Sequence, residues 1–430
     1  MAPLARSTAL TVPLALTVVL TSTTRSQQPG GGQPADTTSP ARKDTVEPPP
    51  RVVTPQLDFS GIAFGNYQYH TDSASRITAG GASPNKFEIE RVYLTFRMPV
   101  GDHASIRATT DIFQQPSTAT SGYYRGWVVR LKYGYLQYDF LHDRGGHRGF
   151  NALARIGMLH TVFIDHEEQF WPRFLSQVPT ERNGFFSSAD LGVATLLTLP
   201  ARWGEVYGTI TNGPGYTAPE TDRFKDFALR VSLTPLRAAS GLLETFTISP
   251  WVYKGWLGSK FVTGGTGQVG PVSDGLQRDR WGIFAGLRDH RLTAGGEYAR
   301  RKDATETGAN TVASPRTVVD STGTLWSGFV IVRPFEFATP SARPAFGSVG
   351  AVFRYDRFTP NMSPSSPAYN GTKPYYNTLI AGIFWETTSR TTLAFDYQDQ
   401  SPSSFPQPFT GSVAPTPQAR TWFLHWQATF

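Results

Sequence analysis

The sequence predicts an all-β protein: an antiparallel, up-and-down barrel of about sixteen strands that crosses a membrane. Three observations support this fold class. From Leu57 onward, apolar and polar residues alternate in segments of about ten residues. Short and long connections between these segments alternate along the chain. The last segment places its apolar residues on one face and ends on Phe430.

The composition fits such a barrel and argues against other classes. The chain of 430 residues contains 41 Gly, 33 Pro, 10 Trp, 17 Tyr and 29 Phe, and 17% of its residues are charged. Glycine and proline serve turns, and aromatic residues suit strands and membrane interfaces. Cysteine is absent, which excludes disulfide bonds and thiolate metal sites. A mean hydropathy of −0.29, without a long apolar run after the N-terminal segment, argues against membrane-spanning helices.

The N-terminal part of the chain differs from the rest. Residues 1–28 are expected to form a secretory signal peptide, because Arg6 precedes an apolar run too short to span a membrane as a helix. Export would place the mature protein in the cell envelope. Residues 29–56 are rich in Gly, Pro, Thr and Ser, so we expect a disordered or extended periplasmic tail. The barrel is then expected over residues 57–430.

The order of the connections predicts how the strands are joined. The expected strands are residues 57–69, 86–98, 103–114, 126–141, 150–161, 187–199, 202–211, 223–236, 244–256, 280–288, 291–302, 324–336, 346–358, 376–387, 390–401 and 419–430. Tight connections, such as 99–102 and 289–290, alternate with long ones, such as 162–186 and 303–323. In an up-and-down barrel every second connection lies on the same side, which predicts short periplasmic turns and long external loops. A soluble sandwich or propeller has no reason to sort its connections in this way.

The two faces of each segment predict what surrounds the barrel. Val92, Leu94 and Phe96 share one face of their segment, and Arg91 and Arg97 lie on the other. The same division recurs in later segments. A barrel of about sixteen strands is too wide for such apolar side chains to fill. We therefore expect the apolar face to contact lipid and the charged face to line a water-filled lumen.

The C-terminal segment shows this division most clearly. Trp422, Leu424, Trp426, Ala428 and Phe430 fall on one face. Taken alone, the segment also fits an ordinary buried edge strand. Within a barrel, we expect this face to contact lipid and the strand to pair with the first one, so that the sheet has no free edge.

Several of these segments resemble the phosphate-selective porins O and P. The similar pieces are residues 87–96 (FEIERVYLTF), residues 154–158 (ARIGM), residues 181–193 and the aromatic C-terminal strand. The resemblance implies an outer-membrane porin, commonly trimeric, in which the third external loop folds into the pore and narrows it. Here that loop would be residues 162–186, whose aromatic side chains provide apolar surface for docking against the wall.

Charged residues on the expected lumen positions define the candidate site. The formal net charge is +7, and removal of Arg6 and Arg25 with the signal peptide leaves 7 − 2 = +5. The candidate pore-lining and selectivity residues are Arg91, Arg97, Arg107, Asp111, Arg130, Lys132, Arg155, Asp165, Glu167, Glu168, Arg173 and Arg230. Arginine offers oxyanions a planar fork of donors, so a row of such residues favours anions. Alternatively, these cations pair with acids such as Asp111 and Asp226 and brace the wall.

The acids of residues 162–186 form the second half of this site. Asp165, Glu167 and Glu168 either face the arginines across a constriction and orient solutes in a transverse field, or are simply solvated. His166 lies among them, but a metal site needs three or four converging ligands. Neither a His-Glu-x-x-His nor a Gly-x-Ser-x-Gly spacing occurs. We expect no catalysis, no cofactor and no metal.

The sequence therefore predicts a porin in the outer membrane of a Gram-negative-type bacterium. It would pass small anionic or neutral hydrophilic solutes by diffusion, with a mild preference for anions, phosphate among them. The expected partners are outer-membrane lipid, lipopolysaccharide and further copies in a homotrimer. Nucleic acid is not expected, because the basic residues alternate with apolar ones. The alternatives are a non-conducting barrel that acts as an adhesin or structural protein, and an outer-membrane enzyme.

Overall fold

The computed structural model describes the part of the chain that was expected to form the barrel, except for several connections. The described residues are 56–114, 126–142, 149–220, 222–258, 275–307, 317–337, 348–360, 375–402 and 419–430. The expected signal peptide, 1–28, and the expected tail, 29–56, lie outside the described residues except for Gln56. The chain divides into Met1–Val53 and Thr54–Phe430, and the second unit contains every described residue.

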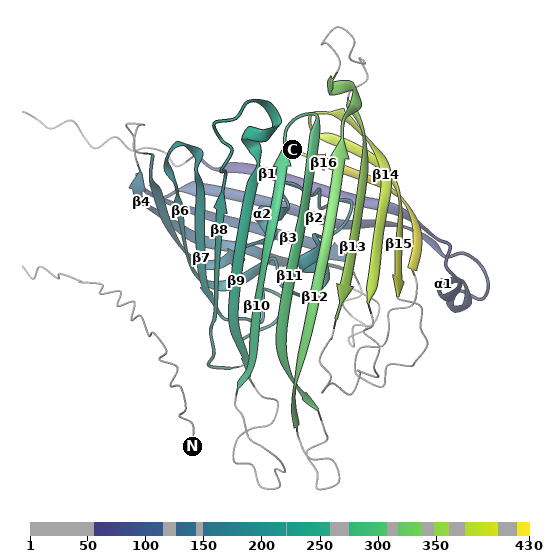
Figure 1. The fold of residues 1–430 in the computed structure, drawn as a ribbon, viewed down its shortest axis with the longest axis horizontal. Helices are drawn as coiled ribbons and strands as arrows, with labels where there is room; N and C mark the ends of the chain where they lie inside the picture. The colour runs from purple at the N-terminus through teal and green to yellow at the C-terminus, as the bar shows by residue number, and fades with distance from the viewer. Residues whose placement is uncertain are drawn as a thin grey trace, which may run out of the picture. The chain divides into compact units, whose positions relative to one another are not determined.

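Sixteen antiparallel strands close into one barrel (Figure 1). They are β1 (Asp58–His70), β2 (Asn85–Pro99), β3 (Ala104–Gln114), β4 (Trp127–His142), β5 (Asn151–His160), β6 (Ala189–Thr198), β7 (Gly204–Thr211), β8 (Asp226–Leu233), β9 (Thr247–Gly258), β10 (Gly275–Arg288), β11 (Leu292–Thr307), β12 (Thr317–Val332), β13 (Ser348–Thr359), β14 (Tyr376–Thr388), β15 (Thr391–Pro402) and β16 (Ala419–Thr429). Each strand pairs with its neighbours in sequence, and β1 pairs with β16. The predicted fold class, strand number and strand order are confirmed.

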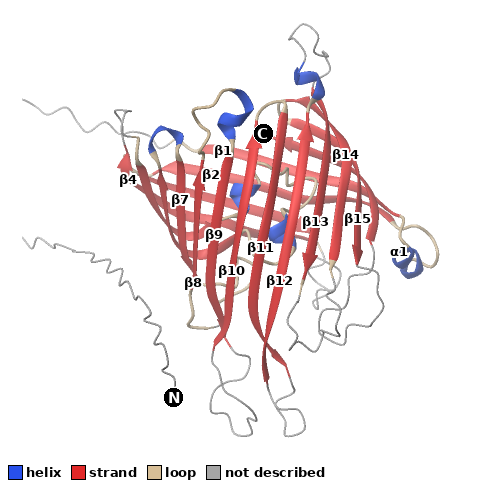
Figure 2. Cartoon of the chain, viewed as in Figure 1, coloured by secondary structure: helices blue, strands red, loops and turns tan. Residues whose placement is uncertain are grey.

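Helices are confined to the connections (Figure 2). They are α1 (Ser73–Thr78), α2 (Ile164–Glu167), α3 (Pro179–Arg182) and the 3₁₀ turns η1 (Pro200–Arg202), η2 (Gly241–Thr245) and η3 (Pro334–Phe337). Among the described residues, no helix is long and apolar enough to cross a membrane.

The connections alternate in length as predicted. Residues 100–103, 289–291 and 389–390 form short turns at one end of the barrel, and η1, η2 and η3 lie in connections at the same end. At the other end, the connection between β5 and β6 spans residues 161–188. Some expected boundaries differ, since β10 begins at Gly275 and not at residue 280, and the largest difference lies between β11 and β12. The predicted long loop 303–323 is mostly strand, because β11 and β12 remain paired as far as Thr307 and Thr317.

The strand register assigns alternate side chains to opposite faces. Phe227, Phe395 and Leu424 are about half exposed on the outer surface, whereas Arg354 and Asp356 are fully buried inside. The apolar face therefore points outward on β8, β15 and β16, as the alternation predicted. A soluble barrel would show the opposite arrangement.

Candidate functional site

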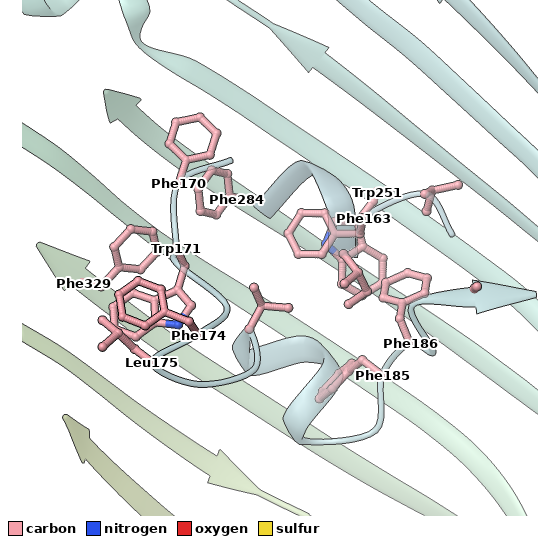
Figure 3. Close-up of a cluster of buried hydrophobic side chains, with 14 of the residues drawn as sticks. Phe163, Phe170, Trp171, Phe174, Leu175, Phe185, Phe186, Trp251, Phe284 and Phe329 are labelled. Carbon is pink, nitrogen blue, oxygen red and sulfur yellow. The ribbon is translucent and has the colours of Figure 1, made fainter. Parts of the chain in front are cut away.

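The connection between β5 and β6, residues 161–188, folds into the barrel and packs within its buried core; we call it the inner loop. Its aromatic rings pack against rings that point inward from the wall (Figure 3). Ring centroids are 5.5 Å apart between Phe163 and Trp251 of β9, and 5.3 Å apart between Trp171 and Phe329 of β12. Burying such a ring stabilises the docked loop by roughly 1.5–3 kcal/mol. The predicted inward third loop is confirmed.

Basic side chains of the wall hold the backbone of the inner loop. Arg230 of β8 donates from Nε to the carbonyl oxygen of Val162 at 2.6 Å, and Arg354 of β13 donates from Nη1 to that of Gln177 at 2.8 Å. Further donors to loop carbonyls are Arg280, Arg288, Arg301 and Gln398. A loop outside the sheet leaves its carbonyls without ladder partners, and these side chains satisfy them. Arg230, predicted to line the pore, is instead a buried anchor of the inner loop.

The inner face of β2 to β4 holds a braced ion triplet. The carboxylate of Asp111 lies 2.9 Å from Arg91 and 2.8 Å from Arg130, and Asp111 is fully buried. Arg130 also donates to the hydroxyl of Tyr216, from the connection between β7 and β8, at 2.9 Å. These three predicted residues therefore follow the bracing alternative, in which acids of the wall neutralise the arginines.

Four other predicted cations, Arg97, Arg107, Lys132 and Arg155, form what we call the cation cluster. None of them forms a salt bridge with any described residue. Arg97 and Arg107 are register partners on β2 and β3. Arg107 lies 3.1 Å from Nε2 of His160, and Arg155 donates to the side chain of Gln137 at 2.9 Å. The cluster thus places positive charge on the inner wall, and no described carboxylate of the wall neutralises it.

A β-bulge completes this wall with a residue that the alternation misses. The pairing of β3 with β4 shifts between Thr109 and Thr110, and both Lys132 and Tyr133 are buried inside. A bulge places two residues opposite one, so consecutive side chains face the same way. Strict alternation assigns Tyr133 to the outer face. In the structure its hydroxyl donates to Asp165 at 2.8 Å, and its ring centroid lies 4.9 Å from Cζ of Arg107.

Two of the predicted loop acids lie near the lumen wall. Asp165 is partly exposed, accepts the bond from Tyr133 and lies 3.1 Å from Nε2 of His160, beside the cation cluster. Glu168 pairs with Arg173 of the same loop, and Arg173 also lies 2.6 Å from Glu181. Arg173 is therefore neutralised within the inner loop.

Glu167 does not line the lumen, contrary to the prediction. Its side chain is fully buried beneath the inner loop and accepts a hydrogen bond from Thr180 Oγ1 at 3.2 Å. The cause is the single turn of α2: successive side chains point about 100° apart, so Glu167 turns away from Asp165. Burial raises the pKa of Glu167 to about 8, although the guanidinium of Arg354 lowers it.

His166 serves packing and not metal binding. Its Nδ1 lies 2.9 Å from Arg230 Nη1, and its Nε2 lies 2.8 Å from Ser249 Oγ. Burial, together with the charge of Arg230, lowers the pKa of His166 well below its usual value. Within the described ranges, no group of three or more His, Asp or Glu residues converges as a metal site.

Two cavities lie against the inner loop. One, of about 200 Å³, lies toward the short turns and is lined by Glu168, Trp171 and Arg333, among others. The other, of about 240 Å³, lies toward the long loops and is lined by residues that include Phe186 and Arg278. A cavity therefore lies on each side of the inner loop along the barrel axis.

Sequence reasoning missed the aromatic wall that receives the inner loop. Trp251, Phe284 and Phe329 point inward, where polar residues were expected. A signal is visible on β10, because Ile283 and Ala285 flank Phe284, so that both faces of this stretch are apolar. A strand with two apolar faces needs an apolar partner inside the barrel as well as lipid outside.

Comparisons with known proteins agree with this geometry at the level of the fold. No family model matches the sequence, and no curated protein sequence matches it. Among solved structures, the outer membrane channel DcaP of Acinetobacter baumannii matches with a TM-score of 0.56 at 11% identity, covering 87% of this chain and 97% of that one. OmpF of Salmonella typhi in complex with daunomycin gives 0.55 at 11% identity, with the same coverage, 87% and 97%. The anion-selective porin from Comamonas acidovorans gives 0.53 at 11% identity, covering 88% and 100%. The chain therefore has the barrel fold of outer-membrane porins.

Proposed function

We propose that the protein is an outer-membrane porin that passes small hydrophilic solutes by diffusion and prefers anions. The cation cluster carries this proposal: Arg97, Arg107 and Arg155 are at least partly exposed on the inner wall and form no salt bridge with a described carboxylate, and the buried Lys132 adds positive charge behind them. The inner loop narrows the barrel beside them. Guanidinium groups stay charged at any working pH, so the cluster attracts anions under all conditions of growth.

The arrangement of the cluster along the strands supports passage as well as attraction. Arg107 and Arg155 lie at different levels of the wall, because Arg107 opposes Tyr135 and Arg155 opposes Gln137, two residues further along β4. Positions two residues apart on a strand are separated by roughly 7 Å. A hydrated anion can therefore move between neighbouring cations without leaving their field, and binding at several weak sites favours conduction.

Acids of the inner loop keep the preference mild. Asp165 reaches His160 at the edge of the cation cluster, and Glu168 lies on the same loop. Negative charge beside the positive wall produces a transverse field that orients dipolar solutes and partly offsets the attraction of anions. Small neutral hydrophilic solutes then pass as well.

The finer parts of the proposal rest on the sequence resemblance. Similarity to phosphate-selective porins suggests phosphate among the solutes, and paired guanidinium groups such as Arg97 and Arg107 suit an oxyanion. It also suggests a homotrimer in lipid and lipopolysaccharide. Residues 1–28 would direct export and residues 29–56 would lie in the periplasm. One structural neighbour is described as anion-selective, in keeping with the proposed preference.

Conductance in planar lipid bilayers tests the function. The purified protein is expected to give open-channel currents. In a KCl gradient, their reversal potential should lie toward the equilibrium potential of chloride. Replacing Arg107 and Arg155 by glutamine should reduce the anion-to-cation permeability ratio by a factor on the order of two to five. Lys254→Gln with Lys302→Gln is the matched control, because both lysines are about half exposed on the outer surface. It should leave the ratio unchanged.

Two outcomes would contradict the proposal at different levels. If the folded protein gave no open-channel current, the porin function would be wrong, and an adhesin, structural barrel or outer-membrane enzyme would replace it. If currents were present but the wild-type reversal potential lay on the potassium side, only the anion preference would be wrong.

A further inference from the structure

The outer surface of the barrel changes from apolar to charged along one line near the long loops. On β9, β11, β13 and β16, the first polar outward residues beyond the apolar stretch are Lys254, Arg300, Arg357 and Arg420. On β2 and β4 the outward residues toward the same end stay apolar: Phe87 is 85% exposed and Val129 is 63% exposed. The cations therefore belong to one sector of the surface.

Two of these cations flank a row of aromatic rings. Trp281 and Tyr298 have ring centroids 5.5 Å apart, and Tyr298 and Trp326 have centroids 4.5 Å apart. In the strand register, Arg300 opposes Trp281 and Arg357 opposes Trp326. A guanidinium group thus lies at each end of the row. Tryptophan and tyrosine on an outer barrel surface mark the level at which hydrocarbon gives way to headgroups.

The two arginines differ from their neighbours in charge balance. Lys254 lies 3.8 Å from Asp279, and Arg420 lies 3.1 Å from Asp399. No described carboxylate pairs with Arg300 or Arg357, and both side chains are exposed. Cζ of Arg357 lies 4.0 Å from the ring centroid of Tyr375, which holds the guanidinium beside the strand while its edge stays open.

We propose that Arg300 and Arg357 bind phosphate groups on the headgroup of a lipid in the membrane leaflet at the long-loop end, while the aromatic row packs against its acyl chains. The proposal rests on the membrane location given by the proposed function. A guanidinium fork matches a phosphate bidentately, and an aromatic surface directly below it suits an acyl chain. The arginines are two strand spacings apart and offset by two residues in register, which separates them by roughly 12 Å. That span suits a lipid with two phosphates, as in lipopolysaccharide.

Binding of lipopolysaccharide to the full-length protein in a zwitterionic detergent tests the proposal. Replacing Arg300 and Arg357 by glutamine should weaken binding about tenfold or more. Lys254→Gln with Lys302→Gln is the matched control. It removes the same charge from the same surface, but both lysines pair with aspartates, at 3.8 Å and 2.9 Å. This variant should change binding less than twofold. Lipopolysaccharide stripped of its phosphates should bind wild type as weakly as intact lipopolysaccharide binds the arginine variant.

Several outcomes would overturn the lipid site. One is equal binding of lipopolysaccharide by wild type and the arginine variant. Another is displacement of lipopolysaccharide by millimolar inorganic phosphate, which would indicate a site for free phosphate. A third is a changed oligomeric state of the arginine variant with unchanged lipid binding, which would indicate a contact between copies of the chain.

Conductance separates this proposal from the proposed function. The arginine variant should conduct like wild type, because both arginines face away from the lumen. A wild-type protein that bound lipopolysaccharide but carried no current would refute the porin function and leave the lipid site standing. A conducting protein whose arginine variant bound lipopolysaccharide normally would refute only the lipid site.

Discussion

Asp165 lies beside the cation cluster, and we expect its negative charge to weaken the preference of that cluster for anions. It accepts a hydrogen bond from Tyr133 at 2.8 Å and lies 3.1 Å from His160, which itself lies 3.1 Å from Arg107. Asp165→Asn keeps the shape and removes one negative charge. We expect the anion-to-cation permeability ratio to rise by roughly twofold. Reversal potentials in a KCl gradient measure the change.

A matched variant separates this local effect from a change in total charge. Asp320→Asn removes the same charge from an exposed position on the outer surface, where Asp320 pairs with Lys302. It should not move the reversal potential. An equal shift in both variants would show that Asp165 acts only through the net charge of the protein.

Glu167 makes the docking of the inner loop dependent on pH. Burial raises its pKa from an ordinary 4.5 to about 8, so the folded protein holds a proton there that the unfolded chain releases at lower pH. The contribution to stability is complete below pH 4.5, falls as the pH rises, and is lost above about pH 8. Glu167→Gln keeps the hydrogen-bonding shape without the charge.

Thermal unfolding of wild type and Glu167→Gln between pH 4 and 9 tests the direction of this change in stability with pH. The two proteins should unfold at similar temperatures near pH 4, and the variant should unfold at the higher temperature near pH 9. A difference that stayed constant across this range would mean that the pKa of Glu167 is the same in the folded and the unfolded protein.

At the scale of the element, the inner loop stays in the barrel because the wall supplies both rings and donors. Arg354 combines the two roles: it pairs with Asp356 at 2.6 Å, donates to the carbonyl of Gln177 and lies with Cζ 4.8 Å from the ring centroid of Trp171. Arg354→Met leaves Asp356 buried without its partner, at a cost of about 3–5 kcal/mol. We expect the inner loop to detach and open-channel conductance to rise.

Proteolysis within residues 161–188, together with single-channel recording, checks this expectation. Arg333→Met is the control, because Arg333 pairs with Glu386 at 2.8 Å and donates to no described loop carbonyl. If Arg354→Met fails to fold, Arg354→Lys retains the charge but not the fork and should show a smaller effect of the same sign. Unchanged conductance and proteolysis in both Arg354 variants would mean that the rings alone hold the inner loop.

At the scale of the whole molecule, the seam between β1 and β16 closes the barrel. Gly61 and Phe430 exchange two backbone hydrogen bonds of 2.8 and 3.0 Å. The ring of Phe430 lies over Gly61 so closely that a Cβ there would come within 2.2 Å of it. Deleting Phe430 removes both bonds, worth about 0.5–1.5 kcal/mol each, and the ring contact.

Deletion of Phe430 should therefore reduce the yield of assembled barrel more than it changes the conductance of the barrels that form. Folded yield in detergent and single-channel conductance measure the two effects separately. Phe337→Ala removes an exposed ring in η3, at the same end of the barrel but away from the seam, and should assemble normally. Normal assembly of the deletion variant would show that the seam closes without this contact.

Much of this fold was predictable because its main constraints are local. The period of two is present in each strand, as in Trp422, Leu424 and Trp426, and a barrel too wide to be filled by its apolar side chains places that face outward. The alternation of short and long connections then predicted the up-and-down order of the strands. The aromatic content of residues 162–186 predicted that this loop docks against the inner wall of the barrel.

The candidate site was less predictable than the fold. The partners of a charged residue depend on strand register and on contacts between distant segments. The alternation placed Arg107 and Arg230 on the same inner face, but only the packed barrel left Arg107 in the cation cluster and buried Arg230 beneath Val162. Likewise, the bulge turned Tyr133 inward, and the single turn of α2 buried Glu167. The sequence by itself determined which side chains face outward and which face the interior, since a two-residue period needs no tertiary information. Tertiary structure decided which interior charges remain open to solutes, since neutralisation requires partners brought together from separate strands and the inner loop.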